Sequence, residues 1–131
     1  MTFCNSTFYL GTSSPEENLS VDCTFRGSMA KVDVQTGAIL WQTLTLPDNF
    51  GKTREYAGAA IWGSSPAIDI RRNLVYVATG NLYSAPTNVI QCQELENNQN
   101  VPTHPDECIE PRNHENSVLA FDISHGNIKM G

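Results

Sequence analysis

The sequence predicts an all-β fold. Three strand–turn–strand patterns follow one another along its 131 residues, each with apolar runs joined at turns that contain Gly or Asn. No segment keeps the three- and four-residue apolar spacing of an amphipathic helix over about eleven positions. We therefore expect one domain of antiparallel strands spanning residues 1–131, with a modest hydrophobic core.

The first elements are a single strand and a hairpin. The stretch STFYLGTSS, residues 6–14, is a short aromatic and aliphatic run that ends in Gly and Ser. The hairpin that follows has strands at Ser28–Val34 and Ala38–Leu46, joined by a turn at Gln35–Gly37. Gly37 suits a turn position with positive φ.

Two further hairpins complete the pattern. The first lies in SPAIDIRRNLVYVATGN (residues 65–81), with its turn near Arg71–Asn73, and the second in SVLAFDISHGNIKM (residues 117–130), with its turn at Ser124–Gly126. Between them lies a polar connection of about 82–116. A connection of that length in a compact domain indicates a functional or disulfide-pinned loop.

Composition excludes several classes of partner. The net charge is -6 with only eight Lys and Arg, whereas nucleic acids and anionic membrane surfaces are bound by clustered cations. No apolar run approaches the roughly 20 residues of a membrane span. The first ten residues lack the basic and apolar regions of a signal peptide.

The cysteines predict an oxidising compartment. Cys4, Cys23, Cys92 and Cys108 have no zinc-site spacing. Of the possible connectivities, we favour the local pairs Cys4–Cys23 and Cys92–Cys108, the second closing a polar loop. Glycosylation triplets at Asn5 and Asn18 point the same way. We expect an extracellular or secretory-pathway glycoprotein whose true N-terminus is absent from the sequence.

An internal sequence repeat indicates which all-β fold to expect. VDVQTGAILW (residues 32–41) and FDISHGNIKM (residues 121–130) share one pattern, and their aspartates, Asp33 and Asp122, lie 89 residues apart. That distance is about two periods of a four-stranded propeller blade, with the hairpin of Asp69 between them. The sequence therefore predicts a partial β-propeller of two to three blades, fewer than the roughly 4–8 that close a ring.

The repeats resemble those of a known family. AKVDVQTGAILW (residues 30–41) fits the pattern Ala-x-x-Asp-x-x-Thr-Gly-x-x-x-Trp of the repeats in pyrroloquinoline quinone (PQQ) dehydrogenases. The second repeat departs from it at His125 and Met130. The stretches GTSSPEE, CTFRGSMAKVDVQTGAILWQT, YAGAAIWGSSPAID and VYVATGNLYSAP resemble plant polyvinyl-alcohol-dehydrogenase-like proteins. The resemblance implies part of an eight-bladed quinoprotein propeller in which Trp41 docks between blades.

The same resemblance implies a calcium ion bound to PQQ. Glu16, in GTSSPE, matches a calcium-ligating carboxylate of the family, with Glu17 as the alternative if the register slips by one. Asn81, which follows Thr79-Gly80, matches an amide-oxygen ligand. The simpler alternatives are a solvated loop carboxylate at Glu16 and an ordinary turn at Asn81.

The resemblance also implies residues that contact the quinone. Trp62, 19 residues before Asn81, matches an aromatic plate under the flat cofactor, and Gly63 lets the backbone approach closely. Ser13, Ser14 and Arg26 suit the cofactor's carboxylates. The alternatives are a core role for Trp62 and an ion pair for Arg26, and for Arg26 we slightly favour the ion pair.

We therefore expect a fragment of a PQQ- and calcium-dependent oxidoreductase acting on small or polymeric alcohols. The family's catalytic Asp would lie beyond position 130, so we assign no catalytic residue and expect the isolated chain to be inactive. No C-x-x-C-H haem motif is present. The alternative is a non-catalytic propeller segment that binds a protein partner. In either case we expect the missing blades, or self-association, to cover its flanks.

Overall fold

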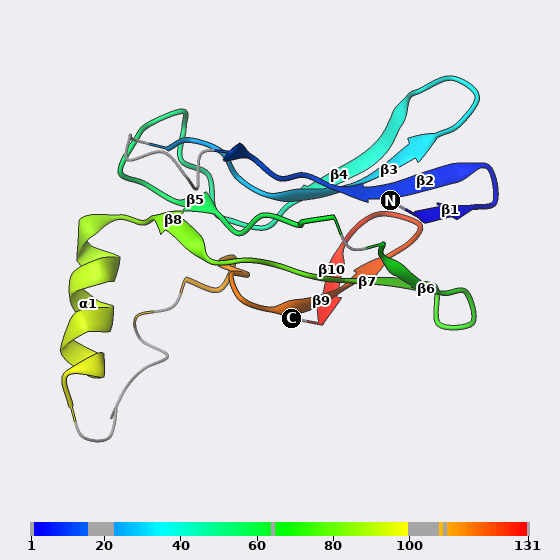
Figure 1. Ribbon diagram of the computed structural model, residues 1–131. Helices are drawn as coiled ribbons and strands as arrows, with labels where there is room; N and C mark the ends of the chain where they lie inside the picture. Colours follow the sequence, from blue (N-terminus) through cyan, green and yellow to red (C-terminus); the bar gives the residue numbers. More distant parts are fainter. Residues whose placement is uncertain (1, 16–22, 64, 100–107, 109, 131) are drawn as a thin grey trace.

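The protein consists mainly of two antiparallel sheets stacked face to face (Figure 1). The structure is a computed structural model that describes residues 2–15, 23–63, 65–99, 108 and 110–130. A two-stranded ribbon and one helix occupy the end of the molecule away from the hairpin turns, on the left in Figure 1. Within the described ranges no helix is long and apolar enough to cross a membrane.

The first sheet is a meander whose strands lie in chain order, and it contains the predicted first hairpin. Its strands are β1 (Thr2–Cys4), β2 (Thr7–Gly11), β3 (Ser28–Asp33) and β4 (Ile39–Leu44). The sequence did not predict β1, which turns into β2 through Asn5 and Ser6, both at positive φ. Asn tolerates this conformation better than most residues, so a tight turn forms without glycine.

The second sheet combines the other two predicted hairpins. Its order is β10-β9-β7-β6, from β6 (Ala67–Asp69), β7 (Leu74–Ala78), β9 (Val118–Asp122) and β10 (Ile128–Met130). The prediction that the 89 residues between Asp33 and Asp122 span two blade periods is therefore wrong. Asp33 and Asp122 belong to neighbouring sheets, and the long excursion between β7 and β9 enlarges a single period.

The two sheets are joined by an extended segment that passes between them. It contains β5 (Ala57–Gly58), which pairs with β8 (Leu82–Ser84). The Gly27 N–H donates to the Gly58 carbonyl at 2.9 Å, and the Gly80 N–H donates to the Ala60 carbonyl at 2.9 Å. A Cβ on Gly27 would lie 2.0 Å from the Ala59 oxygen, so the first sheet and this segment touch backbone to backbone.

The excursion contains a helix, which corrects the all-β prediction. Helix α1 (Thr87–Asn97) buries none of its residues. A helix without a buried face needs no apolar stripe, which explains why the periodicity test did not find it. The disulfide Cys92–Cys108 ties α1 to the returning chain and confirms the predicted loop closure.

The other predicted disulfide, Cys4–Cys23, is wrong, because both residues are thiols in the structure. Cys4 pairs with Thr7, which in turn pairs with Asp33 at the far end of β3. Cys23 comes five residues before β3 begins at Ser28. The two cysteines thus belong to opposite ends of the first sheet, beyond the roughly 4.4–6.8 Å between Cα atoms that a disulfide requires.

The main core lies between the sheets. It is built from Tyr9, Met29, Ile61, Val75, Val77, Leu119 and Phe121. Trp41 closes one side: its ring stacks on Phe121 at 6.2 Å, and its Nε1 donates to the Ile123 carbonyl at 2.9 Å. The predicted docking of Trp41 on a neighbouring sheet is therefore confirmed.

Candidate functional site

The candidate residues gather where β2 and β7 end. Ser13 and Ser14 come just after β2, and Asn81 comes three residues after β7. The joining segment brings Trp62 to the same end, because the Ile61 N–H donates to the Thr12 carbonyl at 2.9 Å. Residues from three distant parts of the chain thus share one end of the two sheets.

Trp62 lies against the turn that precedes Asn81. A Cβ built on Gly80 would sit 3.4 Å from the Trp62 Nε1, so glycine lets the indole lie close to the backbone. Trp62 is 44% exposed, which sets it apart from the partly buried Trp41. The simple core role weighed for Trp62 does not describe an indole this open. Gly63 follows it and is also exposed.

Asn81 is held by its backbone and presents its side chain to solvent. Its carbonyl accepts the Ala59 N–H at 2.8 Å, and its Nδ2 donates to the Leu82 carbonyl at 2.9 Å. Among the described residues, no donor reaches Asn81 Oδ1. An amide oxygen fixed in this way is a suitable ligand for a hard cation such as Ca²⁺.

Arg26 makes the ion pair that the sequence favoured. Its Nη2 lies 3.4 Å from Asp48 Oδ1, and its Nη1 donates to the Leu46 carbonyl at 3.4 Å. The Arg26 side chain is 19% exposed. Its assignment to a cofactor carboxylate stays a prediction, and a cofactor would have to compete with Asp48.

The predicted carboxylate ligand lies outside the described residues. Both Glu16 and the alternative Glu17 fall in the range 16–22. In the part of the chain that the structure describes, no three His, Cys, Asp or Glu side chains cluster as a metal site would require. The pairing of Glu16 with Asn81 around one ion therefore stays a prediction.

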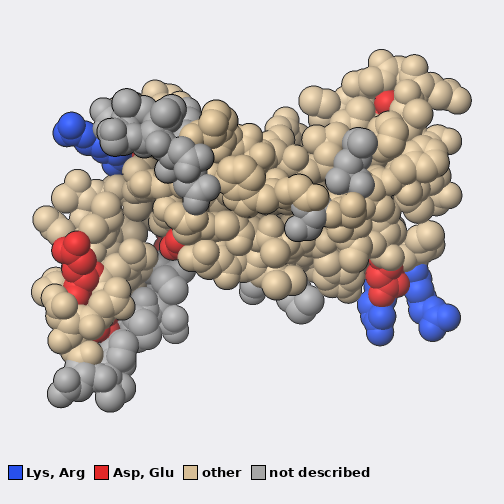
Figure 2. Space-filling model, viewed as in Figure 1, with Lys and Arg blue, Asp and Glu red and all other residues tan. Residues whose placement is uncertain are grey.

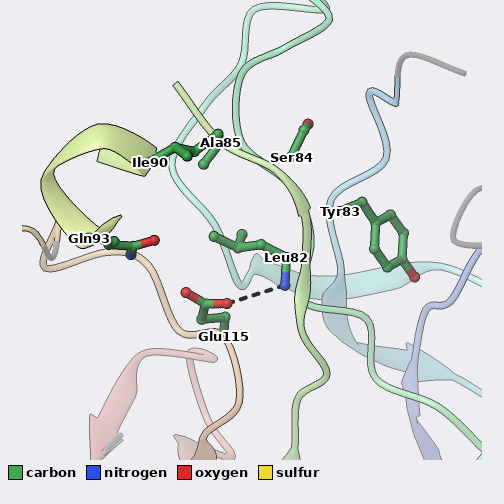
Figure 3. Close-up of a pocket in the computed structure, with 7 residues that line it drawn as sticks. All are labelled: Leu82, Tyr83, Ser84, Ala85, Ile90, Gln93 and Glu115. Atoms are coloured by element: carbon green, nitrogen blue, oxygen red, sulfur yellow. Dashed lines mark hydrogen bonds between the residues drawn. The ribbon is translucent and has the colours of Figure 1, made fainter. Parts of the chain in front are cut away.

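Glu115 is a carboxylate near this end that sequence reasoning did not select. Its Oε2 accepts the Leu82 N–H at 3.2 Å, next to Asn81, and its Oε1 lies 3.4 Å from Asn113 Nδ2. It faces a hollow of about 220 Å³ between β8 and α1 (Figure 3). Glu115 lies in a polar loop and belongs to no motif, so the sequence does not indicate that it lies beside Asn81.

The aspartates of the hairpin turns lie beside the starts of β2 and β7, away from this end, and serve the turns instead. Asp122 Oδ1 accepts the N–H groups of Ser124 and His125, and Asp33 Oδ1 accepts those of Gln35 and Thr36. The hydrogen bond from the His125 N–H is the main cause that lowers the pKa of Asp122. For Asp69, the hydrogen bond from the Arg72 side chain lowers the pKa most. These carboxylates stay ionised as turn caps.

Comparison with known proteins supports the fold and the resemblance. The chain is 41% identical over 71 residues to the polyvinylalcohol dehydrogenase of Pseudomonas sp and 38% over 72 residues to that of Sphingopyxis sp. (strain 113P3). Each match covers 47% of this chain and 11% of the relative. No protein-family model matches.

A solved structure shares the fold over nearly the whole chain. The quinohemoprotein alcohol dehydrogenase from Comamonas testosteroni superposes with a TM-score of 0.55 and 18% identity, covering 97% of this chain and 19% of that one. The predicted resemblance is therefore confirmed: the chain has a fold of the quinoprotein alcohol dehydrogenase type. It spans about a tenth of the length of the curated relatives that it matches.

Proposed function

We propose that this chain forms one side of the PQQ- and calcium-binding site of an alcohol oxidoreductase. The observation that carries the proposal is the exposed Trp62 indole lying against the Gly80 backbone, one residue from the open amide oxygen of Asn81. The similarity to polyvinylalcohol dehydrogenases supports an alcohol as the substrate of the whole enzyme. The propeller would have further blades, eight in all if it follows the family pattern.

The donor set fits the proposed group. A flat tricyclic quinone needs an aromatic plate, which Trp62 would supply. Ca²⁺ prefers oxygen ligands, of which Asn81 would supply one and, as the family resemblance implies, Glu16 a second. Ser13 and Ser14 offer hydroxyl groups to the carboxylates of the cofactor. When bound, the quinone accepts the electrons of the alcohol, and the calcium ion acts as a Lewis acid.

We also propose an oxidising compartment for the protein. The Cys92–Cys108 bond supports this, because structural disulfides persist in secreted and periplasmic proteins and are rare in the cytosol. The buried Cys23 thiol does not argue against it, since small apolar cores often include unoxidised cysteine.

Equilibrium titration with PQQ tests the proposal. The purified chain is titrated with and without CaCl₂, and binding is followed by calorimetry at low protein concentration. We expect saturable binding that Ca²⁺ tightens, a loss of about tenfold or more in affinity for Trp62→Leu, and partial rescue by Trp62→Phe. Asn81→Ala should remove the effect of Ca²⁺ while leaving weak binding.

The matched control is Asn98→Ala, which changes an exposed asparagine at the end of α1, away from Trp62. This variant should bind like the wild type. Binding that is absent, or that is unchanged by Trp62→Leu, would contradict the proposed site.

A further inference from the structure

At the start of β8, two side chains bind the backbone where a neighbouring strand would otherwise pair. The Asn81 carbonyl accepts the Ala59 N–H of the joining segment at 2.8 Å. Because successive residues of an extended chain turn their backbone groups to opposite sides, the Leu82 groups face away from that segment. Glu115 Oε2 accepts the Leu82 N–H at 3.2 Å, and Asn81 Nδ2 donates to the Leu82 carbonyl at 2.9 Å. One peptide residue is thus held from both sides by side chains.

The Leu82 carbonyl sets the direction of the Asn81 amide. A backbone carbonyl only accepts hydrogen bonds, so the nitrogen of the Asn81 side chain must face it. The oxygen is the other branch of the same planar group and points away, to a place that no donor among the described residues reaches. The direction of this open oxygen therefore depends on how firmly Leu82 is held.

Glu115 is fixed by the chain that returns from the excursion. The Asn116 N–H donates to the Gly80 carbonyl at 2.9 Å, which brings this segment alongside the turn before Asn81. Asn113 Oδ1 accepts the Glu115 N–H at 3.2 Å, and Asn113 Nδ2 lies 3.4 Å from Glu115 Oε1. The carboxylate consequently points at the Leu82 N–H, as Figure 3 shows.

We propose that Glu115 is a positioning residue for the cation-binding oxygen of Asn81, an inference that rests on the proposed function. It acts through the Leu82 peptide: the carboxylate holds the N–H, and the carbonyl of the same residue anchors the Asn81 amide. A hydrogen bond to an ionised carboxylate is stronger than one to a neutral acceptor. Residues that orient a metal ligand in this way typically contribute about 10–100-fold to metal affinity.

The contacts favour this role over direct ligation by Glu115. Both of its carboxylate oxygens already face groups of the chain, Oε2 the Leu82 N–H and Oε1 the Asn113 Nδ2. The Asn81 oxygen faces no described donor. A cation beside this strand would therefore meet the Asn81 oxygen without displacing an existing hydrogen bond, whereas binding to Glu115 would compete with one.

Nuclear magnetic resonance without PQQ or Ca²⁺ tests the positioning itself. In the wild type, we expect the two Nδ2 protons of Asn81 to have well-separated shifts and slow solvent exchange; Asn81→Ala identifies these signals by their loss. Glu115→Ala should bring the two shifts together and speed exchange. Glu115→Gln should keep the wild-type pattern, because its amide oxygen can still accept the Leu82 N–H. The remaining signals show whether each variant is folded.

Titration with PQQ at a series of CaCl₂ concentrations tests the consequence for the cation. Glu115→Ala should raise the apparent Kd for Ca²⁺ by about tenfold or more and leave the affinity for PQQ without Ca²⁺ unchanged. Glu115→Gln should restore most of the Ca²⁺ affinity. A purely structural role would weaken PQQ binding under both conditions.

The matched control is Glu94→Ala. It removes the same charge from the exposed surface of α1, where Figure 2 shows acidic side chains. This variant should match the wild type in the Asn81 signals and in the affinity for Ca²⁺. A loss equal to that of Glu115→Ala would assign the effect to net charge and contradict the positioning role.

Three further results would overturn the proposal. They are Asn81 signals that Glu115→Ala leaves unchanged, a Ca²⁺ affinity that Glu115→Ala leaves unchanged, and a Glu115→Gln variant as weak as Glu115→Ala. A different pattern would separate the proposed function from this inference. If the wild type bound no PQQ with Ca²⁺ while Glu115→Ala still released the Asn81 amide, the cofactor site would be wrong and the control of the Asn81 amide by Glu115 would be supported.

Discussion

At the scale of single residues, one motif has two different surroundings. Gly37 and Gly126 share their turn, their left-handed φ and their backbone hydrogen bonds, yet Trp41 covers only Gly126. The motif Asp-x-x-x-Gly was readable from the sequence because it is local. Which of its two copies would be covered depended on the neighbouring sheet.

Alanine at the two glycines should separate turn strain from packing. Gly37→Ala should lower the free energy of unfolding by about 1 kcal/mol, because alanine disfavours a left-handed φ. Gly126→Ala should lower the free energy of unfolding by roughly 1–3 kcal/mol more than Gly37→Ala does, since its Cβ would displace Trp41. Urea unfolding of both variants measures the difference, and equal losses would contradict the Trp41 packing.

The turn aspartates should make stability depend on acid pH. Hydrogen bonds from the Thr36 and His125 N–H groups are the main causes that lower the pKa values of Asp33 and Asp122 in the folded protein. Their contribution is therefore complete above about pH 4 and is lost as the pH falls through the folded pKa values. In Asp33→Asn/Asp122→Asn, we expect a shallower acid decline of the unfolding midpoint. If the unfolding midpoint of the double variant fell with acid as steeply as that of the wild type, the acid dependence would come from other groups.

At the scale of elements, the helix behaves differently from the strands. The strands were predictable because apolar runs between turn residues mark them along the chain. Helix α1 has no buried residue, and its position depends on Cys108, which lies beyond it in the sequence. An exposed helix that is held by a disulfide to a later part of the chain shows no periodic apolar pattern in the sequence.

Removing this tie should loosen α1 and spare the sheets. We expect Cys92→Ser/Cys108→Ser to lower the free energy of unfolding by at most about 3 kcal/mol, the value for closing a loop of this size. Hydrogen exchange should speed up in α1 and stay slow in β3 and β9. Reducing agent should reproduce the change in the wild type and leave the variant unaltered, because Cys4 and Cys23 form no disulfide.

At the scale of the whole molecule, stability comes from stacking one sheet on the other. Residues of both sheets form one core, and Trp41 joins the sheets through the Ile123 carbonyl. The same stacking brings Trp62 and Asn81 to one end, where the candidate site lies. The core and the site therefore depend on the same arrangement.

Equivalent substitutions on the two sheets should measure that stacking. Met29→Ala should cost about 2–5 kcal/mol, because Met29 is fully buried between the sheets. Val118→Ala, at the equivalent exposed position, should change stability by about 0.5 kcal/mol or less in the monomer. Denaturant unfolding at low protein concentration compares them. Similar losses at both positions would contradict the one-sided burial.

The sequence by itself determined the local structure: the three hairpins, the turn aspartates and glycines, the Cys92–Cys108 closure and the family resemblance. These follow from neighbouring residues and from patterns along the chain. Only the tertiary structure decided that the second and third hairpins share a sheet, that Cys4 and Cys23 lie apart, and that Trp62 lies against Gly80. The physical reason is that contacts between distant segments depend on how sheets stack and where chains cross, which no local pattern encodes.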